Sequence, residues 1–127
     1  MKEIILVFFG SGLGGVLRFG IGKWVNTLHN YHFPFGTLIV NIIACFVVGL
    51  LIGLADYKQL LTAQIKLFWM IGFCGGFSTF SAFSGETILL FQHGQYLSSI
   101  VYVLSSVLLC LAATLGGMMM VERTFIL

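Results

Sequence analysis

The distribution of apolar residues along this chain constrains its fold more than any motif does. Four predominantly apolar stretches, at about 4–28, 35–55, 67–91 and 96–121, are separated by short polar connections. A helix needs roughly 20 apolar residues to cross a hydrocarbon core of about 30 Å. Of the 127 residues, 59% are hydrophobic and 8% are charged, which leaves too few polar groups to solvate a globule of this size. The sequence therefore predicts an all-α membrane protein, a single domain (1–127) of four transmembrane helices.

The third apolar stretch is interrupted near its middle by the string GFCGGFSTFSAFS, residues 72–84. Two adjacent glycines, Gly75 and Gly76, lower the cost of non-helical backbone angles. The hydroxyl groups of Ser78 and Thr79 can bond to nearby backbone groups and compete with the helical hydrogen bonds. We therefore expect the third helix to be broken near residues 74–79. Freed carbonyls can bind a cation and freed amides an anion, provided that protein or a wet cavity surrounds them.

Polar side chains inside the other spans are expected to face the bundle interior or a hydrated pathway. Thr37 and Asn41 are four residues apart and share one face of the second helix. The Asn41 amide either joins two helices by hydrogen bonds or serves a pathway. Ser106, Cys110 and Thr114 repeat every four residues and form a weakly polar stripe on the fourth helix. This stripe either allows close helix packing or lines the same pathway.

Two ionisable residues and two phenylalanines are further candidates. Arg18 lies about two-thirds along the first span, where its charge must reach the interface or find a partner. Glu86 is the only acid inside a predicted span and is a candidate for a vestibule, although helix tilt would instead place it at the headgroups. Phe80 and Phe83 share a face just beyond the expected break. Their electropositive ring edges can contact an anion, and packing is the alternative.

Small residues at four-residue spacing predict close helix contacts. These pairs are Gly10 and Gly14, Gly49 and Gly53, Gly72 and Gly76, and Ala112 and Gly116. Because one four-helix unit has a limited interior, some of these faces suggest a second subunit, and we expect a homodimer.

Sequence motifs of enzymes and of nucleic-acid binding are absent: there is no HExxH, no nucleophile elbow, no phosphate loop and no basic patch. The three cysteines, Cys45, Cys74 and Cys110, fall inside predicted helices without metal-ligand spacing, so we interpret them as small packing residues. The sequence therefore does not predict an enzyme.

Three motifs resemble those of a known family. The string at 72–84, the second-helix string GTLIVN (36–41) and the first-helix string GGVLRF (14–19) look like the hallmark motifs of the Fluc (CrcB) fluoride channels. The resemblance covers the whole chain in length, helix count and motif order. It implies a channel that exports fluoride passively across the bacterial inner membrane and so reduces its toxicity. It also implies an antiparallel, dual-topology homodimer, whereas the positive charges alone favour one orientation with cytoplasmic termini.

The resemblance also implies site residues. Fluoride would pass along Asn41, Phe80, Ser81, Phe83, Ser106, Cys110 and Thr114. The backbone carbonyls of Gly75 and Ser78 in both subunits would hold a structural sodium ion (Na⁺) at the dimer axis. Vestibular or structural roles are expected for Arg18, Thr37, Thr79 and Glu86. Ala82 and Cys110 depart from the family pattern, because hydroxyl side chains are usual at these positions.

Two alternatives are weighed against this function. A small multidrug-type proton-coupled antiporter also has four short helices and can form an antiparallel dimer. It needs a titratable carboxylate near the middle of the membrane, and the first helix offers only Glu3 at its extreme end. A purely structural membrane subunit would need neither a polar stripe nor a broken helix.

Overall fold

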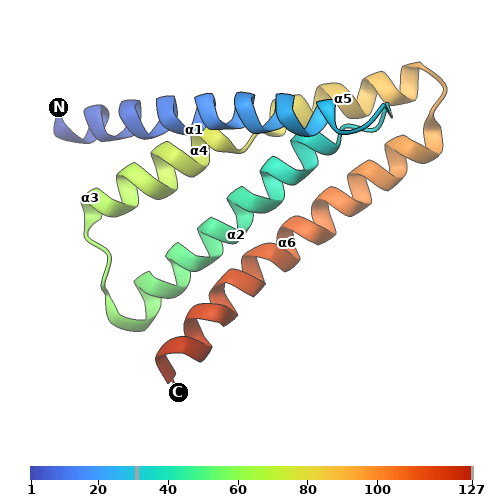
Figure 1. Ribbon diagram of the computed structural model, residues 1–127. Helices are drawn as coiled ribbons and strands as arrows, with labels where there is room; N and C mark the ends of the chain where they lie inside the picture. The colour runs from blue at the N-terminus through green and yellow to red at the C-terminus, as the bar shows by residue number, and fades with distance from the viewer. Residues whose placement is uncertain (31, 127) are drawn as a thin grey trace.

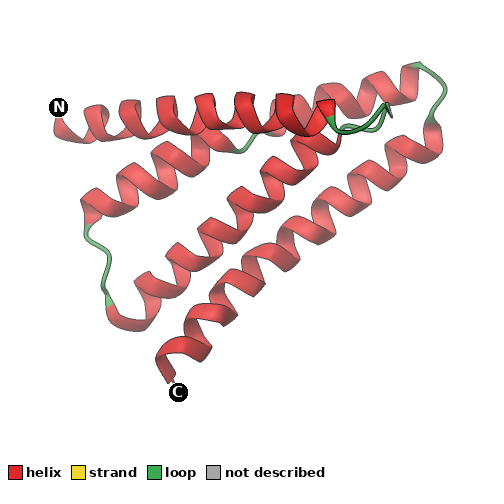
Figure 2. Cartoon of the chain, in the orientation of Figure 1, coloured by secondary structure: helices red, strands yellow, loops and turns green. Residues whose placement is uncertain are grey.

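The computed structural model describes residues 1–30 and 32–126, and the ordered elements within these ranges are all helices (Figure 1, Figure 2). Helix α1 covers Lys2–Thr27, α2 covers Phe35–Lys58 and α6 covers Tyr96–Ile126. The third span is divided into α3 (Ala63–Lys66), a π-helical segment η1 (Leu67–Cys74), α4 (Gly75–Phe77) and α5 (Phe80–Gln92).

Four stretches of helix in the described residues are long and apolar enough to cross a membrane. They are Lys2–Thr27, Phe35–Tyr57, Ala63–Gln92 and Tyr96–Ile126. The prediction of an all-α, multi-pass membrane protein with an interrupted third helix is confirmed.

The spans run alternately in opposite directions, so both termini and the connection between α2 and α3 lie at one end of the molecule (Figure 1). Helix α2 packs along α6, and α1 packs along η1 and α4. The connection from α5 to α6 is short because Gly94 adopts φ +76°, a left-handed conformation that glycine tolerates.

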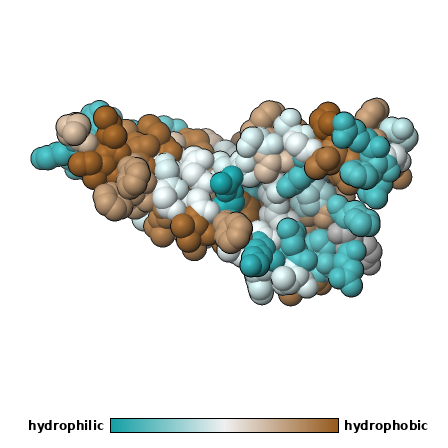
Figure 3. All heavy atoms as spheres, turned by 90° about the horizontal axis from the view of Figure 1, so that it is seen from above, coloured by the Kyte–Doolittle hydropathy of each residue, from teal (hydrophilic) through white to brown (hydrophobic). Residues whose placement is uncertain are grey.

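The outer surface of the bundle is largely apolar. Phe8, Phe19, Leu97 and Leu108 are examples of large hydrophobic side chains exposed on its helices. On the face shown in Figure 3, hydrophobic residues gather over one half, and hydrophilic residues gather at the opposite end. Six buried residues form two small clusters, one of Leu38, Leu90 and Tyr102 and one of Val40, Ala44 and Phe77. Large apolar side chains on the outside and only small buried clusters inside are the arrangement expected of a chain surrounded by lipid.

Glycines bring α1 into backbone contact with the third span. A Cβ atom at Gly14 would collide with the carbonyl of Phe73, and one at Gly76 would collide with Ser11. Gly10 and Gly72 face each other in the same contact. The predicted small-residue contacts of this region are confirmed.

These glycines serve helix packing, not unwinding. Gly75 has φ −64° and ψ −38°, and the backbone stays helical through Phe77. The expectation that the chain unwinds from residue 74 onward is therefore wrong for residues 74–77, and only residues 78 and 79 leave the helix.

Glycines also set the contact between α2 and α6. A Cβ atom at Gly49 would collide with the carbonyl of Thr114, and one at Gly53 would lie 3.0 Å from the Cβ of Val121. The predicted contacts at Gly49 and Gly53 are confirmed.

The partner face of α6 differs from the expectation. Ala112 and Gly116 are exposed, and nothing lies within 4 Å of a Cβ built at Gly116. Gly117 is buried instead, against the carbonyl of Phe46. The face of α6 toward α2 is centred one residue later, and contact of Ala112 and Gly116 with a second subunit stays a prediction.

We expect Gly49→Ala to loosen the α2–α6 contact, because its methyl group must displace the Thr114 backbone. Overpacking of this kind costs about 1–3 kcal/mol. The matched variant Gly116→Ala places its methyl group in open space and gains helix propensity, so its stability should equal or exceed that of the wild type. The midpoint of thermal unfolding in detergent measures both variants. Equal midpoints for the two would contradict the close contact.

Candidate functional site

The third span is interrupted at Ser78 and Thr79, whose backbone angles are extended (φ −81°, ψ 159° and φ −151°, ψ 119°). Thr79 Oγ1 accepts a hydrogen bond from Ala82 N–H at 3.2 Å and so caps the first turn of α5. Ser78 Oγ donates to the carbonyl of Cys74 at 2.8 Å. The prediction that hydroxyl groups bond to nearby backbone groups here is confirmed; Thr79 takes the Ala82 N–H from the helical pattern, whereas Ser78 keeps its own N–H bond to Cys74 at 2.9 Å.

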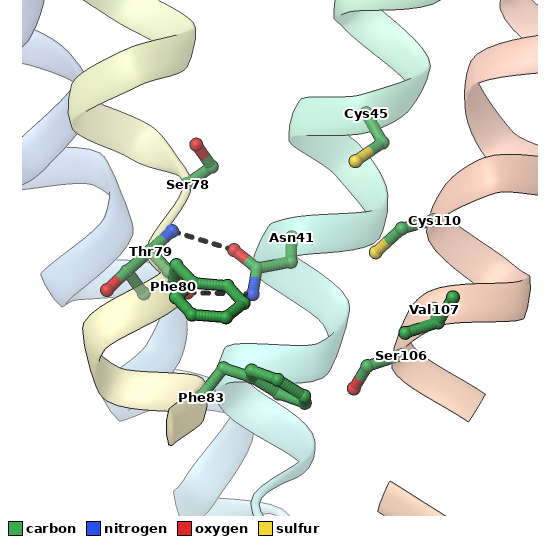
Figure 4. A pocket seen from close by; sticks show the side chains of 9 residues that line it. All are labelled: Asn41, Cys45, Ser78, Thr79, Phe80, Phe83, Ser106, Val107 and Cys110. Atoms are coloured by element: carbon green, nitrogen blue, oxygen red, sulfur yellow. Dashed lines mark hydrogen bonds between the residues drawn. The ribbon is translucent and has the colours of Figure 1, made fainter. Parts of the chain in front are cut away.

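Asn41 holds the interruption from the neighbouring helix α2. Its Nδ2 donates to the carbonyl of Thr79 at 3.1 Å, and its Oδ1 accepts from Thr79 N–H at 2.8 Å (Figure 4). Leaving a buried backbone group unpaired costs about 1–3 kcal/mol. Of the two roles expected for Asn41, the structure shows the first: its amide joins two helices by hydrogen bonds. Both bonds go to the backbone of Thr79.

The same bonds release two carbonyls from their usual partners. In a continuous α-helix, Thr79 N–H would bond the carbonyl of Gly75, and Ala82 N–H would bond that of Ser78. Both amides are instead taken by side-chain oxygens, those of Asn41 and of Thr79. Gly75 is also exposed, with nothing within 4 Å of a Cβ built on it. The carbonyls of Gly75 and Ser78 thus lack the donors that a continuous helix would supply.

A cavity of about 270 Å³ lies between the interruption, α2 and α6. It is lined by Asn41, Cys45, Ser78, Thr79, Phe80, Phe83, Ser106, Val107 and Cys110 (Figure 4). Ser106 is only 7% exposed, and its Oγ has no hydrogen-bond partner among the described residues. This hydroxyl can therefore form a hydrogen bond with a water or an ion that enters the cavity.

This cavity brings together five of the predicted pathway residues: Asn41, Phe80, Phe83, Ser106 and Cys110. Two others do not line it. Ser81 is exposed, and its Oγ lies 3.2 Å from that of Thr79. Thr114 Oγ1 lies 3.2 Å from the carbonyl of Cys45 and 3.1 Å from that of Cys110. Within this chain Thr114 therefore serves the contact between α2 and α6.

The two phenylalanines at the cavity have different surroundings. Their ring centroids are 5.5 Å apart. Phe83 packs against the cluster that contains Tyr102, at 5.2 Å between ring centroids, whereas Phe80 is 79% exposed. Of these two rings, Phe83 is the one that packs against the core of the chain.

Glu86 joins three helices. Thr37 Oγ1 donates to its Oε1 at 2.7 Å, and the hydroxyl of Tyr102 donates to its Oε2 at 2.8 Å. Tyr102 is fully buried and was not among the predicted site residues. The signal was present, because Tyr102 lies four residues before Ser106 and extends the polar stripe of the fourth helix by one turn.

Arg18 lies at a second cavity, of about 500 Å³, near the other side of the interruption. Lys23 and Thr37 also line it, and it reaches Thr79 and Ala82. Thr79 therefore borders both cavities. Ala82 contributes a methyl group to the second cavity, at a position where a hydroxyl group was expected from the resemblance.

We expect Glu86→Leu to destabilise the bundle, because the hydroxyl groups of Thr37 and Tyr102 both lose their acceptor. The expected loss is about 1–3 kcal/mol for each hydroxyl group. Thr124→Val is the matched control, since it removes an exposed hydrogen bond of 2.8 Å to the carbonyl of Met120. Denaturant titration in detergent measures both, and a wild-type free energy of unfolding for Glu86→Leu would contradict the arrangement.

Comparison with known proteins identifies the family. The family described as CrcB-like protein, Camphor Resistance (CrcB), matches residues 5–118, which include the interruption and both cavities. The chain belongs to the CrcB family. Its resemblance to the Fluc (CrcB) channels, first seen in three motifs, is confirmed.

The CrcB relatives match over nearly the whole chain. The protein named "Fluoride-specific ion channel FluC" from Azobacteroides pseudotrichonymphae genomovar. CFP2 is 40% identical over 122 residues, 96% of this chain and 98% of that protein. Its namesake from Rhizobium johnstonii is 42% identical over 118 residues, 93% of this chain and 94% of that protein. The protein of the same name from Flavobacterium psychrophilum is 38% identical over 123 residues, 97% of this chain and 99% of that protein.

Proposed function

We propose that this chain is a fluoride-selective channel that lets fluoride leave the cytoplasm passively across the bacterial inner membrane. The observation that carries the proposal is that one cavity contains the Phe80 and Phe83 rings and the buried Ser106 hydroxyl, which has no hydrogen-bond partner among the described residues. The CrcB membership supports it, because relatives that match more than nine-tenths of the chain are named fluoride-specific channels.

The chemistry of the cavity suits a small, strongly hydrated anion. A selective pore must replace the water around its ion and still release the ion. The Ser106 hydroxyl can donate a hydrogen bond, and the edges of the phenylalanine rings are electropositive. Asn41 has two N–H groups on Nδ2, of which Thr79 uses one, so the second is available to a passing anion. None of these groups changes its charge or forms a covalent bond, which fits passive flow and not an enzyme.

Further residues extend the proposed route. Ser81 and Thr114 would meet the ion beyond the cavity, and Cys110 lies within it as a weak donor. Glu86 and Thr37 would form one vestibule. Arg18 would raise the local anion concentration at the other cavity.

A second copy of the chain would complete the site. Phe80 is 79% exposed, and Gly75 is exposed beside it at the interruption. An antiparallel homodimer would cover both. Two carbonyls from each subunit, those of Gly75 and Ser78, would then surround a sodium ion, which would offset the dipoles of the released carbonyls. Light scattering of the detergent-solubilised protein tests the dimer, and anomalous scattering at its axis tests the ion; a monomer or an empty axis would contradict this assembly.

The family match favours the channel over a small multidrug-type antiporter. The carboxylate of Glu86 is also engaged by two hydroxyl groups, not placed alone at a substrate site.

Fluoride efflux from proteoliposomes, followed with a fluoride electrode beside a chloride control, tests the proposal. We expect rapid fluoride efflux and no chloride efflux. Equal rates for the two anions, or rates equal to those of empty liposomes, would refute it.

A further inference from the structure

Two of the three cysteines line the cavity from facing helices. Cys45 lies on α2 and Cys110 on α6, and Figure 4 shows both thiol groups at the cavity. Both are free thiols. Cys74, the third cysteine, is 2% exposed and does not line the cavity. The chain thus places a pair of thiols where the sequence predicted only packing residues.

The two helices that carry this pair, α2 and α6, are in close contact. Thr114 Oγ1 lies within hydrogen-bond distance of the carbonyls of both cysteines, at 3.2 Å and 3.1 Å. One turn along α2 from Cys45, Gly49 meets the Thr114 backbone with no room for a Cβ atom. The two thiols are therefore carried by helices whose backbones are in close contact, and both side chains face the same cavity.

We propose that Cys45 and Cys110 form a two-thiol binding site for a soft divalent metal ion, with Hg²⁺ as its probe. Thiolate sulfur prefers soft ions to hard ones. On binding, two S–H bonds are replaced by two S–Hg bonds and two protons leave to the buffer, so the product is neutral. A neutral product suits this cavity because its other walls include Phe83 and Val107, and unpaired charge is costly in apolar surroundings.

If the cavity carries fluoride, as the proposed function holds, a metal ion bound at the two thiols would obstruct fluoride flow. The cavity that the two thiols line is also lined by the Ser106 hydroxyl, which has no partner in the described part of the chain and lies on the proposed fluoride route. An ion bound between the two sulfur atoms occupies this space and obstructs the route.

Retention of mercury tests the site independently of transport. The reconstituted protein is loaded with Hg²⁺, washed with glutathione as a competing monothiol, and analysed for bound mercury. We expect the wild type and Cys74→Ala to retain one ion per subunit, and Cys45→Ala and Cys110→Ser to lose it. Retention in either of the last two variants, or loss in Cys74→Ala, would overturn the assignment. Elution volume verifies that each variant is folded, and Cys45→Ser and Cys110→Ala repeat the test with a second side chain.

Fluoride efflux from the same liposomes tests the obstruction, with each variant compared with its own untreated rate. We expect near-complete loss of efflux in the wild type and Cys74→Ala, and no further loss in Cys45→Ala or Cys110→Ser. Wild-type efflux that persists with mercury bound would overturn the obstruction. Absence of efflux from the untreated wild type would contradict the proposed function instead, and mercury retention would still decide the two-thiol site.

Discussion

Replacement of Asn41 by leucine is expected to unfold the interrupted third span or to abolish fluoride efflux through the protein. Leucine has a similar size but can neither donate to the carbonyl of Thr79 nor accept from its N–H, which Asn41 now does at 3.1 Å and 2.8 Å. Two buried backbone groups then lack partners, at a combined cost of roughly 2–6 kcal/mol. Thermal unfolding in detergent and fluoride efflux are the measurements.

A control for this variant is Ile43→Leu, two residues along the same helix at an exposed position. It should unfold at the wild-type temperature and keep its efflux. If Asn41→Leu behaved like this control, the bonds to Thr79 would not be what holds the interruption.

Replacement of Phe80 by isoleucine is expected to reduce fluoride efflux about tenfold, which corresponds to roughly 1.4 kcal/mol in the barrier. Isoleucine keeps the bulk of the side chain but has no electropositive ring edge to offer an anion. Because Phe80 is 79% exposed, the stability of the subunit should not change. Phe83→Ile should reduce both efflux and stability, since Phe83 also packs against the cluster around Tyr102.

The matched control is Phe8→Ile, on α1, at a side chain that is 71% exposed and lines neither cavity. Its efflux should equal that of the wild type. An unchanged rate for Phe80→Ile would remove this ring from the route, and an equal loss for Phe8→Ile would show that the effect is not local.

The interruption could be predicted from the sequence because the residues that cause it lie within the interrupted segment. Ser78 and Thr79 carry hydroxyl groups that bond to the backbone within four residues, and the structure contains these bonds. The glycines beside them were misleading. Gly72 and Gly76 have the same four-residue spacing as a packing face, and that is their use against α1. Local composition alone does not distinguish glycine that unwinds a helix from glycine that lets another helix approach.

The hydrogen-bond partners of the polar residues could not be predicted, because they lie far away along the chain. Asn41 meets Thr79, and Thr37 meets Glu86, across 38 and 49 residues of chain. Such pairs depend on the rotation and relative shift of whole helices, which a four-residue spacing does not specify. The same limit explains why the close contact on α6 falls at Gly117 and not at Gly116. The π-helical segment Leu67–Cys74 has no local signal that we can identify.

The reversal potential of the current across a planar bilayer tests the central claim most directly. With the reconstituted protein between solutions that differ in fluoride, chloride and pH, each gradient is varied separately. The account predicts that the reversal potential follows the fluoride gradient and does not respond to chloride or to pH. A reversal potential that follows chloride, or one that shifts with the pH gradient as proton-coupled exchange requires, would contradict it.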